Sequence, residues 1–279
     1  MTTDFATDNG IFNDISLHVE DTGGTGRPIV LIHGWPLSGE SFRPQIPALQ
    51  AAGYRVITYD RRGFGRSDKT LSNYTYDALT GDLNAILDGL DLTDVTLVGF
   101  SMGGGEVARY VAHYGTDRIR SIVLASAVTP CLMQTPTNPE GPLTPDKAAK
   151  MTASLTASKD SFLDQFMTDF YIAGDHVAVS EDQRQDSLAI AEQCDKNAAL
   201  ACMSAFASTD FRDDIATITI PTLIIHGDSD AVVPYDGSGK RTHNAIAGSQ
   251  THVIAGGPHG CNVSHTAEWN DTVLAFLAD

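Results

Sequence analysis

The chain has 279 residues, 42% of them hydrophobic and 19% charged, as is typical of a soluble globular protein with one sizeable core. Its formal net charge of -17 and pI of about 4.7 argue against nucleic acid and anionic membrane surfaces as partners, because both would repel it. No apolar run is long enough to span a bilayer, and the first residues show neither the basic nor the apolar segment of a secretory signal.

The four cysteines are scattered along the chain and form no C-x-x-C pair: Cys131, Cys194, Cys202 and Cys261. Reduced thiols in a cytoplasmic protein are the simplest interpretation. Cys261 follows His259 by two residues and could be read as a nucleophile. We favour a small buried hydrophobe at this position, because no base is assigned to it.

Strands and helices alternate in the first third of the chain. Strands are predicted over residues 15–20, 28–33 and 54–59, and helices over residues 41–52 and 76–90. The run at 28–33 is continuously apolar, which indicates a strand buried on both faces. Such alternation predicts a parallel or mostly parallel sheet covered by helices on both sides.

The loop His33-Gly-Trp-Pro follows directly after the strand at 28–33. In an acyl-transfer enzyme a loop at this place can supply a backbone N–H to the oxyanion hole, so the N–H of Trp35 is a candidate donor. We interpret His33 as a residue that orients this loop through a hydrogen bond rather than as a general base.

Asp60-Arg-Arg-Gly-Phe-Gly-Arg-Ser67 forms a tight polar turn after the strand at 54–59. It lacks the spacing of the known phosphate-binding loops. We therefore expect a structural turn braced by pairing between Asp60 and an arginine.

A G-x-S-x-G pattern, Gly99-Phe-Ser101-Met-Gly103, lies between a β-branched strand at 95–98 and a helix predicted over 106–114. A sharp strand-to-helix turn leaves little room beside the serine and holds it in a strained conformation, with its hydroxyl projecting above the sheet. Ser101 is therefore the candidate nucleophile, and the N–H of Met102 is the second oxyanion donor. The strand and helix on either side disfavour the alternative, an ordinary Gly-rich turn.

The pattern changes after a further strand at 119–127. Residues 129–214 carry no clear strand signal but contain a Pro-rich loop at 135–145 and helical segments at 147–171 and 181–206. We interpret 129–214 as a helical cap inserted between a first core part, 1–128, and a second, 215–279. The aromatic residues of the cap either line a substrate pocket or, as we favour, pack the cap onto the core: Phe162, Phe166, Phe170 and Tyr171.

Strands and helices alternate again after residue 214, with strands predicted at 222–226 and 251–255 and a last helix at 267–277. The first of these strands leads to Asp228 and Asp230, of which we assign Asp230 to orient a histidine and Asp228 to cap the turn. His259 lies in a Gly-bracketed loop after the last strand, and we interpret the histidines other than His33 and His259 as surface or packing residues. The order Ser101, Asp230, His259 is the one that the α/β-hydrolase fold produces.

These motifs resemble those of the α/β-hydrolase superfamily over essentially the whole chain and, more narrowly, of the cofactor-free haloperoxidase, perhydrolase and aryl esterase group. The resemblance is carried by His33-Gly-Trp-Pro, Asp60-Arg-Arg-Gly-Phe-Gly-Arg-Ser, Gly-Phe-Ser101-Met-Gly-Gly-Gly-Glu-Val-Ala-Arg-Tyr, His-Gly-Asp-Ser-Asp230 and Pro-His259-Gly. It implies an α/β-hydrolase fold with a mostly parallel central sheet, flanking helices and an inserted helical cap. The helical part of the cap at 175–207 matches the group only loosely.

The resemblance implies a serine esterase that also makes peracids from hydrogen peroxide and oxidises bromide without a cofactor; Pro36 matches members with stronger perhydrolase activity. The implied partners are a small ester and peroxide, with no metal, and self-association is plausible because relatives form multimers. No metal-ligand spacing occurs in the sequence. Two alternatives stay open: a lactonase or lactam hydrolase with the same triad, and a ligand receptor without turnover.

Overall fold

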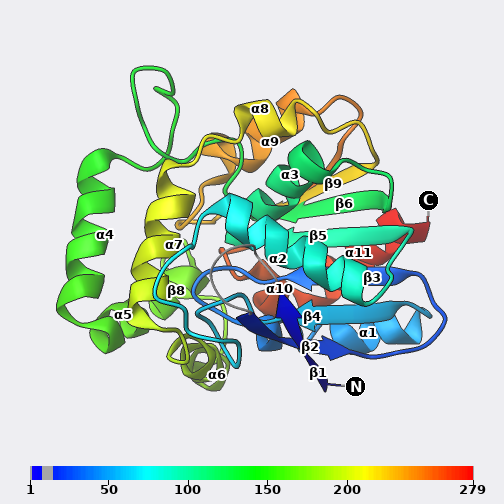
Figure 1. Cartoon of the computed structure of the whole chain (residues 1–279). Helices are drawn as coiled ribbons and strands as arrows, with labels where there is room; N and C mark the ends of the chain where they lie inside the picture. The colour runs from blue at the N-terminus through cyan, green and yellow to red at the C-terminus, as the bar shows by residue number, and fades with distance from the viewer. Residues whose placement is uncertain (1, 8–14, 279) are drawn as a thin grey trace.

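Eight strands form one sheet in the computed structural model, which describes residues 2–7 and 15–278 (Figure 1). The strand order is β1-β2-β4-β3-β5-β6-β9-β10. All neighbours from β4 to β10 pair in parallel, whereas β1 pairs with β2 and β2 with β4 in antiparallel fashion. The strands are β1 (Thr2–Thr7), β2 (Ile15–Asp21), β3 (Pro28–Ile32), β4 (Arg55–Tyr59), β5 (Val95–Phe100), β6 (Ile119–Ala125), β9 (Thr222–Gly227) and β10 (Gln250–Ile254).

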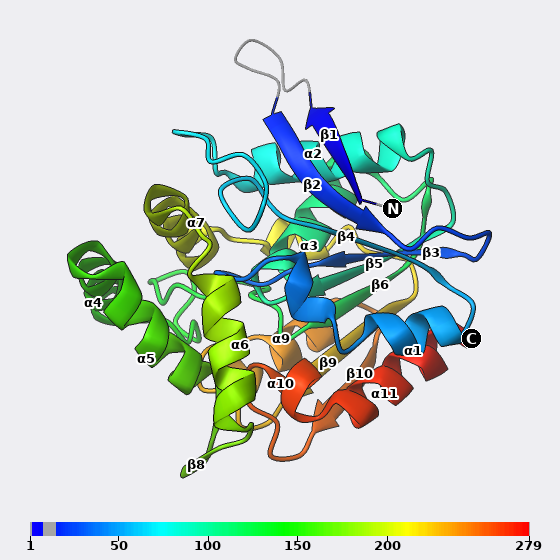
Figure 2. The same ribbon diagram turned by 90° about the horizontal axis from the view of Figure 1, so that it is seen from below.

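Helices cover both faces of this sheet, as the alternating pattern predicts. Helices α2, α3 and α9 lie on one face and α1 and α11 on the other (Figure 2). The helices of this core are α1 (Ile46–Ala51), α2 (Tyr76–Gly89), α3 (Met102–Tyr114), α9 (Gly239–Ala245), α10 (Cys261–Ser264) and α11 (Thr266–Ala278). Because both faces are covered, every residue of β5 is buried, in line with its continuously apolar sequence.

The predicted helix at 41–52 is shorter in the structure. A 3-10 turn, η1 (Gly39–Phe42), comes first, and α1 begins only at Ile46. Pro44 and Pro47 explain the difference, since a proline has no N–H to donate and is tolerated only in the first turn of a helix. The strand β1 was not predicted at all; its sequence, Thr-Thr-Asp-Phe-Ala-Thr, lacks a clear alternation of apolar and polar residues.

Four long helices between β6 and β9 lie together at one end of the sheet in both views (Figures 1 and 2). We call them the insertion helices: α4 (Pro145–Ala157), α5 (Lys159–Tyr171), α6 (Glu181–Ala191) and α7 (Lys196–Ser208). The predicted helical segment at 147–171 is divided at Ser158, whose extended backbone ends α4 and whose side chain caps α5. A two-residue hairpin, β7 (Ile172–Ala173) with β8 (His176–Val177), and the short α8 (Arg212–Ile215) complete this part.

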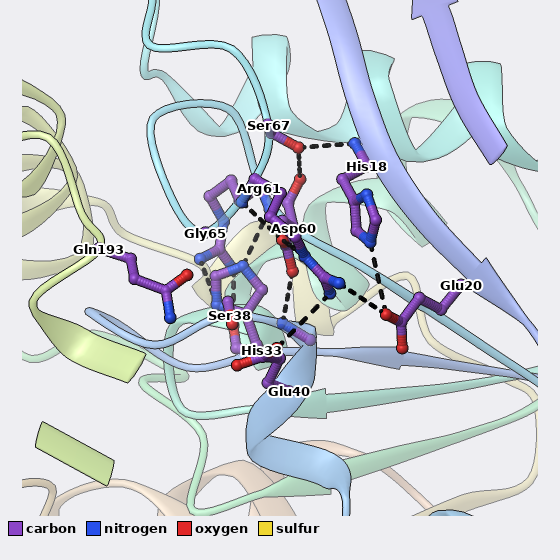
Figure 3. A network of polar contacts seen from close by, with 12 residues as sticks. His18, Glu20, His33, Ser38, Glu40, Asp60, Arg61, Gly65, Ser67 and Gln193 are labelled. Atoms are coloured by element: carbon purple, nitrogen blue, oxygen red, sulfur yellow. Dashed lines mark hydrogen bonds and ion pairs between the residues drawn. The ribbon is translucent and has the colours of Figure 1, made fainter. Parts of the chain in front are cut away.

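The polar turn after β4 is held by buried charges. Asp60 accepts hydrogen bonds from the backbone N–H groups of Gly39 and Arg66 and pairs with the Arg66 side chain, so the predicted Asp60–arginine brace is confirmed. Arg61 instead turns inward, where its Nε donates to Glu106 Oε1 over 2.6 Å. Figure 3 shows His33, Asp60 and Arg61 within this network.

The Arg61–Glu106 ion pair is fully buried, and Tyr59 donates a further hydrogen bond to Glu106. Replacing Glu106 by Gln leaves the Arg61 charge buried without a counter-charge. We expect the free energy of unfolding, measured in urea, to fall by about 3–5 kcal/mol. The matched control is Asp88→Asn, which breaks the exposed Arg118–Asp88 pair and should cost less than about 1 kcal/mol. Equal losses in the two variants would contradict the assigned role of the buried pair.

Candidate active site

Ser101 stands at the turn between β5 and α3, with φ 55° and ψ -116°. Such a conformation is strained for a residue other than glycine. Close packing imposes it: a Cβ on Gly103 would lie 2.3 Å from the carbonyl oxygen of Ile32 on β3, so only glycine lets α3 approach the sheet this closely. The helix therefore begins at Met102 rather than near the predicted Glu106, and the serine side chain is raised above the sheet edge.

His259 reaches Ser101 from the loop after β10. Its Nε2 lies 3.0 Å from Ser101 Oγ, and both residues are buried. Phe170, at the end of α5, packs with its ring perpendicular to the imidazole at 4.8 Å between ring centroids, and its carbonyl accepts the N–H of Gly260. Aromatic packing thus fixes the orientation of the histidine from one side.

Asp230 contacts the other nitrogen of this imidazole, with 2.7 Å between its Oδ2 and His259 Nδ1. Its Oδ1 accepts the backbone N–H groups of Val232 and Val233. Burial raises the pKa of Asp230, but the adjacent His259 and the hydrogen bonds from His226 and His259 outweigh burial and lower this pKa to about 2. Asp228 accepts the N–H of Gly256 and so closes the turn, as predicted.

The loop after β3 lies directly beside the serine: a Cβ on Gly34 would be 3.0 Å from Ser101 Cβ. The loop that carries Trp35 therefore lies beside Ser101, and Met102, the next residue after Ser101, begins α3, so the N–H of Met102 has no acceptor within the helix. His33 holds the loop, because its ring contacts the Gly34 carbonyl and accepts the N–H of Arg61. Burial lowers the pKa of His33 well below 6.5, so this histidine is neutral, as an orienting residue requires.

A cavity of about 570 Å³ opens onto Ser101. Its walls come from Trp35 on the loop after β3, from α4 and α5, and from the segment after Asp230. The apolar part of the lining consists of Trp35, Val128, Leu132, Pro142, Leu143, Met151, Ala157, Phe162, Phe166, Phe206, Ala231, Val232 and Val233. Phe162 and Phe166 thus line the cavity, whereas Phe170 and Tyr171 pack on the loop that carries His259. Two of the four aromatic residues therefore have the first predicted role and two have the second.

The cysteines do not compete for the nucleophile's role. All four are unpaired and buried. Burial raises the pKa of Cys261 to about 12, so its thiol stays protonated, and its contact is with Ser126. Among the residues that the structure describes, no cluster of His, Cys, Asp or Glu is placed to hold a metal ion.

Two contacts of the site were not predicted. His226 lies on β9 and approaches Asp230 with its Nε2, and Phe170 packs on His259. Nothing in the local sequence separates His226 from the other histidines except its place four residues before Asp230. Phe170 belongs to the predicted set of cap aromatics, but its partner is decided only by how α5 lies on the core.

The alpha/beta hydrolase fold family matches residues 27–266, and the chain belongs to this family. The sheet order, the strand-to-helix turn at Ser101 and the histidine loop after β10 agree with that membership. The fold class predicted from the sequence is thereby confirmed.

Among relatives, the chain is 38% identical to a non-heme chloroperoxidase of Kitasatospora aureofaciens, over 91% of this chain and 93% of the relative. It is 31% identical to a bifunctional esterase/perhydrolase of Acinetobacter calcoaceticus, over 94% and 96%. A bromoperoxidase from Bacillus anthracis has the same fold, with 49% identity, a TM-score of 0.96 and full coverage of both chains. The predicted narrower group is confirmed as well.

The lowered pKa of Asp230 predicts a pH-dependent share of stability. The carboxyl titrates near 3.8 when unconstrained and near 2 in the folded protein, so its contribution is complete above about pH 4 and is lost as the pH falls toward 2. The Asp230→Asn variant lacks this pH-dependent contribution to the free energy of unfolding. We expect the difference in free energy of unfolding between wild type and variant, measured in urea at a series of pH values, to shrink through that window. A difference that is constant with pH would contradict the prediction.

Proposed function

We propose that this protein is a serine hydrolase that cleaves small carboxylic esters, aryl esters among them, through an acyl-serine intermediate. The observation that carries the proposal is the continuous hydrogen-bonded chain from Ser101 through His259 to Asp230, located at the wall of an apolar cavity. A strained serine, a histidine base within reach and a buried carboxylate are the parts that acyl transfer requires. The relatives include an esterase/perhydrolase, which agrees with this chemistry.

In the proposed mechanism, His259 Nε2 takes the proton of Ser101 as Oγ attacks the ester carbonyl. The N–H groups of Trp35 and Met102 bind the developing oxyanion, a contribution of about 3 kcal/mol for each such donor. The imidazolium then protonates the leaving alcohol, and Asp230 stabilises the charge of the ring throughout. Water, deprotonated by His259, hydrolyses the acyl-serine and restores the enzyme.

Hydrogen peroxide replaces water in the second half of a perhydrolase reaction. The peroxide oxygen attacks the acyl-serine, the proton passes through His259 to Ser101, and a peracid leaves. The peracid transfers one oxygen to bromide and yields hypobromous acid and the carboxylate, so that halide oxidation follows in solution. The names of the relatives and Pro36, in the loop beside Ser101, support this second activity for the chain.

We further propose that residues 129–214 act as the cap of the site, between core parts 1–128 and 215–279. Lining residues on α4, α5 and α7 support this division, because they close the cavity above Ser101. Small molecules therefore suit the site. No helix in the described ranges is both long and apolar enough to cross a membrane. A cytoplasmic location accords with the four unpaired cysteines.

The decisive variant is Ser101→Ala, assayed with a short aryl acetate in the absence and presence of peroxide and bromide. We expect hydrolysis and bromide oxidation to fall together by about 10³-fold or more, because both pass through the acyl-serine. Circular dichroism checks that the fold is kept. Cys261→Ala is the matched control and should keep most of its activity. Undiminished turnover in Ser101→Ala would refute the proposal.

The side chains that line the cavity should limit the length of the acyl group that the site accepts. Phe162 is half-buried and lies against Trp35, with 6.1 Å between ring centroids. Phe162→Ala enlarges the cavity, so the ratio of kcat/KM for a hexanoate to that for an acetate ester should rise several-fold, each extra buried CH₂ being worth about 0.8 kcal/mol. Phe162→Leu should change this ratio less. A ratio unchanged in both variants would show that acyl groups bind elsewhere.

A further inference from the structure

The Asp230 carboxylate faces two histidines. Besides His259, the ring of His226 on β9 approaches Asp230 Oδ2, with 3.2 Å from its Nε2. The same Nε2 lies 2.8 Å from the carbonyl oxygen of Val233. His226 is completely buried, so no solvent competes for these contacts.

The protonation of His226 follows from its partners. Both groups at Nε2 are acceptors, so Nε2 carries the hydrogen and shares it between them. The other nitrogen, Nδ1, is buried and has no hydrogen-bond partner in the described part of the chain. The backbone of Gly239 covers it so closely that a Cβ there would lie 2.6 Å away, and the ring of Tyr235 packs alongside. A second proton at Nδ1 would be buried without an acceptor, which favours a neutral ring with a single donor.

With this donor, four N–H groups surround Asp230. Oδ1 accepts the N–H groups of Val232 and Val233, and Oδ2 accepts His259 and lies 3.2 Å from His226 Nε2. These contacts oppose rotation of the carboxylate away from His259. A second donor on Oδ2 also withdraws electron density from the oxygen that His259 uses, which weakens its hold on the imidazolium proton.

We propose that His226 is a positioning residue of the active site: its Nε2–H orients the Asp230 carboxylate and moderates the proton affinity of His259. The catalytic consequence rests on the proposed serine-hydrolase function. The hydrogen-bond arrangement itself is a property of the folded protein without substrate, so the two can be tested separately.

The experiment compares His226→Leu, which removes the donor at similar volume, with His226→Gln, whose side-chain amide places an N–H near the position of Nε2. In His226→Leu we expect kcat for a short aryl acetate to fall about 10- to 100-fold with KM nearly unchanged. The acid limb of the kcat/KM profile should move to higher pH by about half a unit or more, because His259 holds its proton more tightly. His226→Gln should restore both quantities most of the way.

A purely structural role predicts a different outcome. Lowered stability with an unmoved acid limb in His226→Leu, or equal defects in the Leu and Gln variants, would overturn the proposal, as would wild-type kinetics in His226→Leu. Where the Leu variant does not fold, His226→Asn takes its place, since its amide is too short to reach Asp230.

A measurement without substrate separates this proposal from the proposed function. The proton between His259 Nδ1 and Asp230 should give a low-field NMR resonance that is lost in His259→Ala. We expect this resonance to shift in His226→Leu and to return toward its wild-type position in His226→Gln. A shift in a protein that shows no esterase activity would uphold the arrangement and refute the function. An unmoved resonance would overturn the role of His226.

Discussion

The close approach of α3 to the sheet is the constraint on which the site depends. At Gly103 the helix lies against the carbonyl oxygen of Ile32, at a distance that no side chain would permit. The chain can enter the helix this near to β3 only through a sharp turn, and Ser101 takes the positive φ of that turn. The same approach places the first N–H groups of α3 beside the loop after β3. One packing contact thus positions both the proposed nucleophile and the proposed oxyanion donors.

Buried charged side chains hold the segments around this turn in place. Each of these charges has an opposite charge or hydrogen-bond donors beside it. Glu106 on α3 pairs with Arg61, and the backbone N–H and side chain of Arg61 in turn bond His33 at the base of the loop after β3. Asp230 has four donors at its two oxygens. Removing one partner from such a group costs more than the bond contributed, because the remaining charge stays desolvated. Both networks are therefore rigid, as a preorganised site requires.

The sequence predicts most of the core and the order of the candidate residues, because these depend on local patterns. Buried parallel strands are largely apolar, and Ser101 and Asp230 each follow such a strand, while His259 follows the parallel edge strand β10. Their meeting at one sheet edge is therefore foreseeable. The contacts that individual side chains make are harder to predict from the sequence. Arg61 and Arg66 stand in the same turn, yet only the fold sends Arg61 to Glu106 and Arg66 to Asp60. The antiparallel β1 has no apolar alternation and escapes prediction for the same reason: its pairing is tertiary.

The insertion helices matter to the chemistry as well as to the shape of the cavity, and α5 shows why. Phe162 and Phe166, near its middle, line the cavity, while Phe170, one turn further, packs on His259 and accepts the N–H of Gly260 through its carbonyl. A helix is stiff over this length, so a change that moves α5 to fit a larger acyl group also moves the support of the imidazole. Substrate range and base position are therefore coupled through one element. Selectivity in this protein is easier to alter by exchanging side chains at the cavity wall than by displacing the helix that carries them.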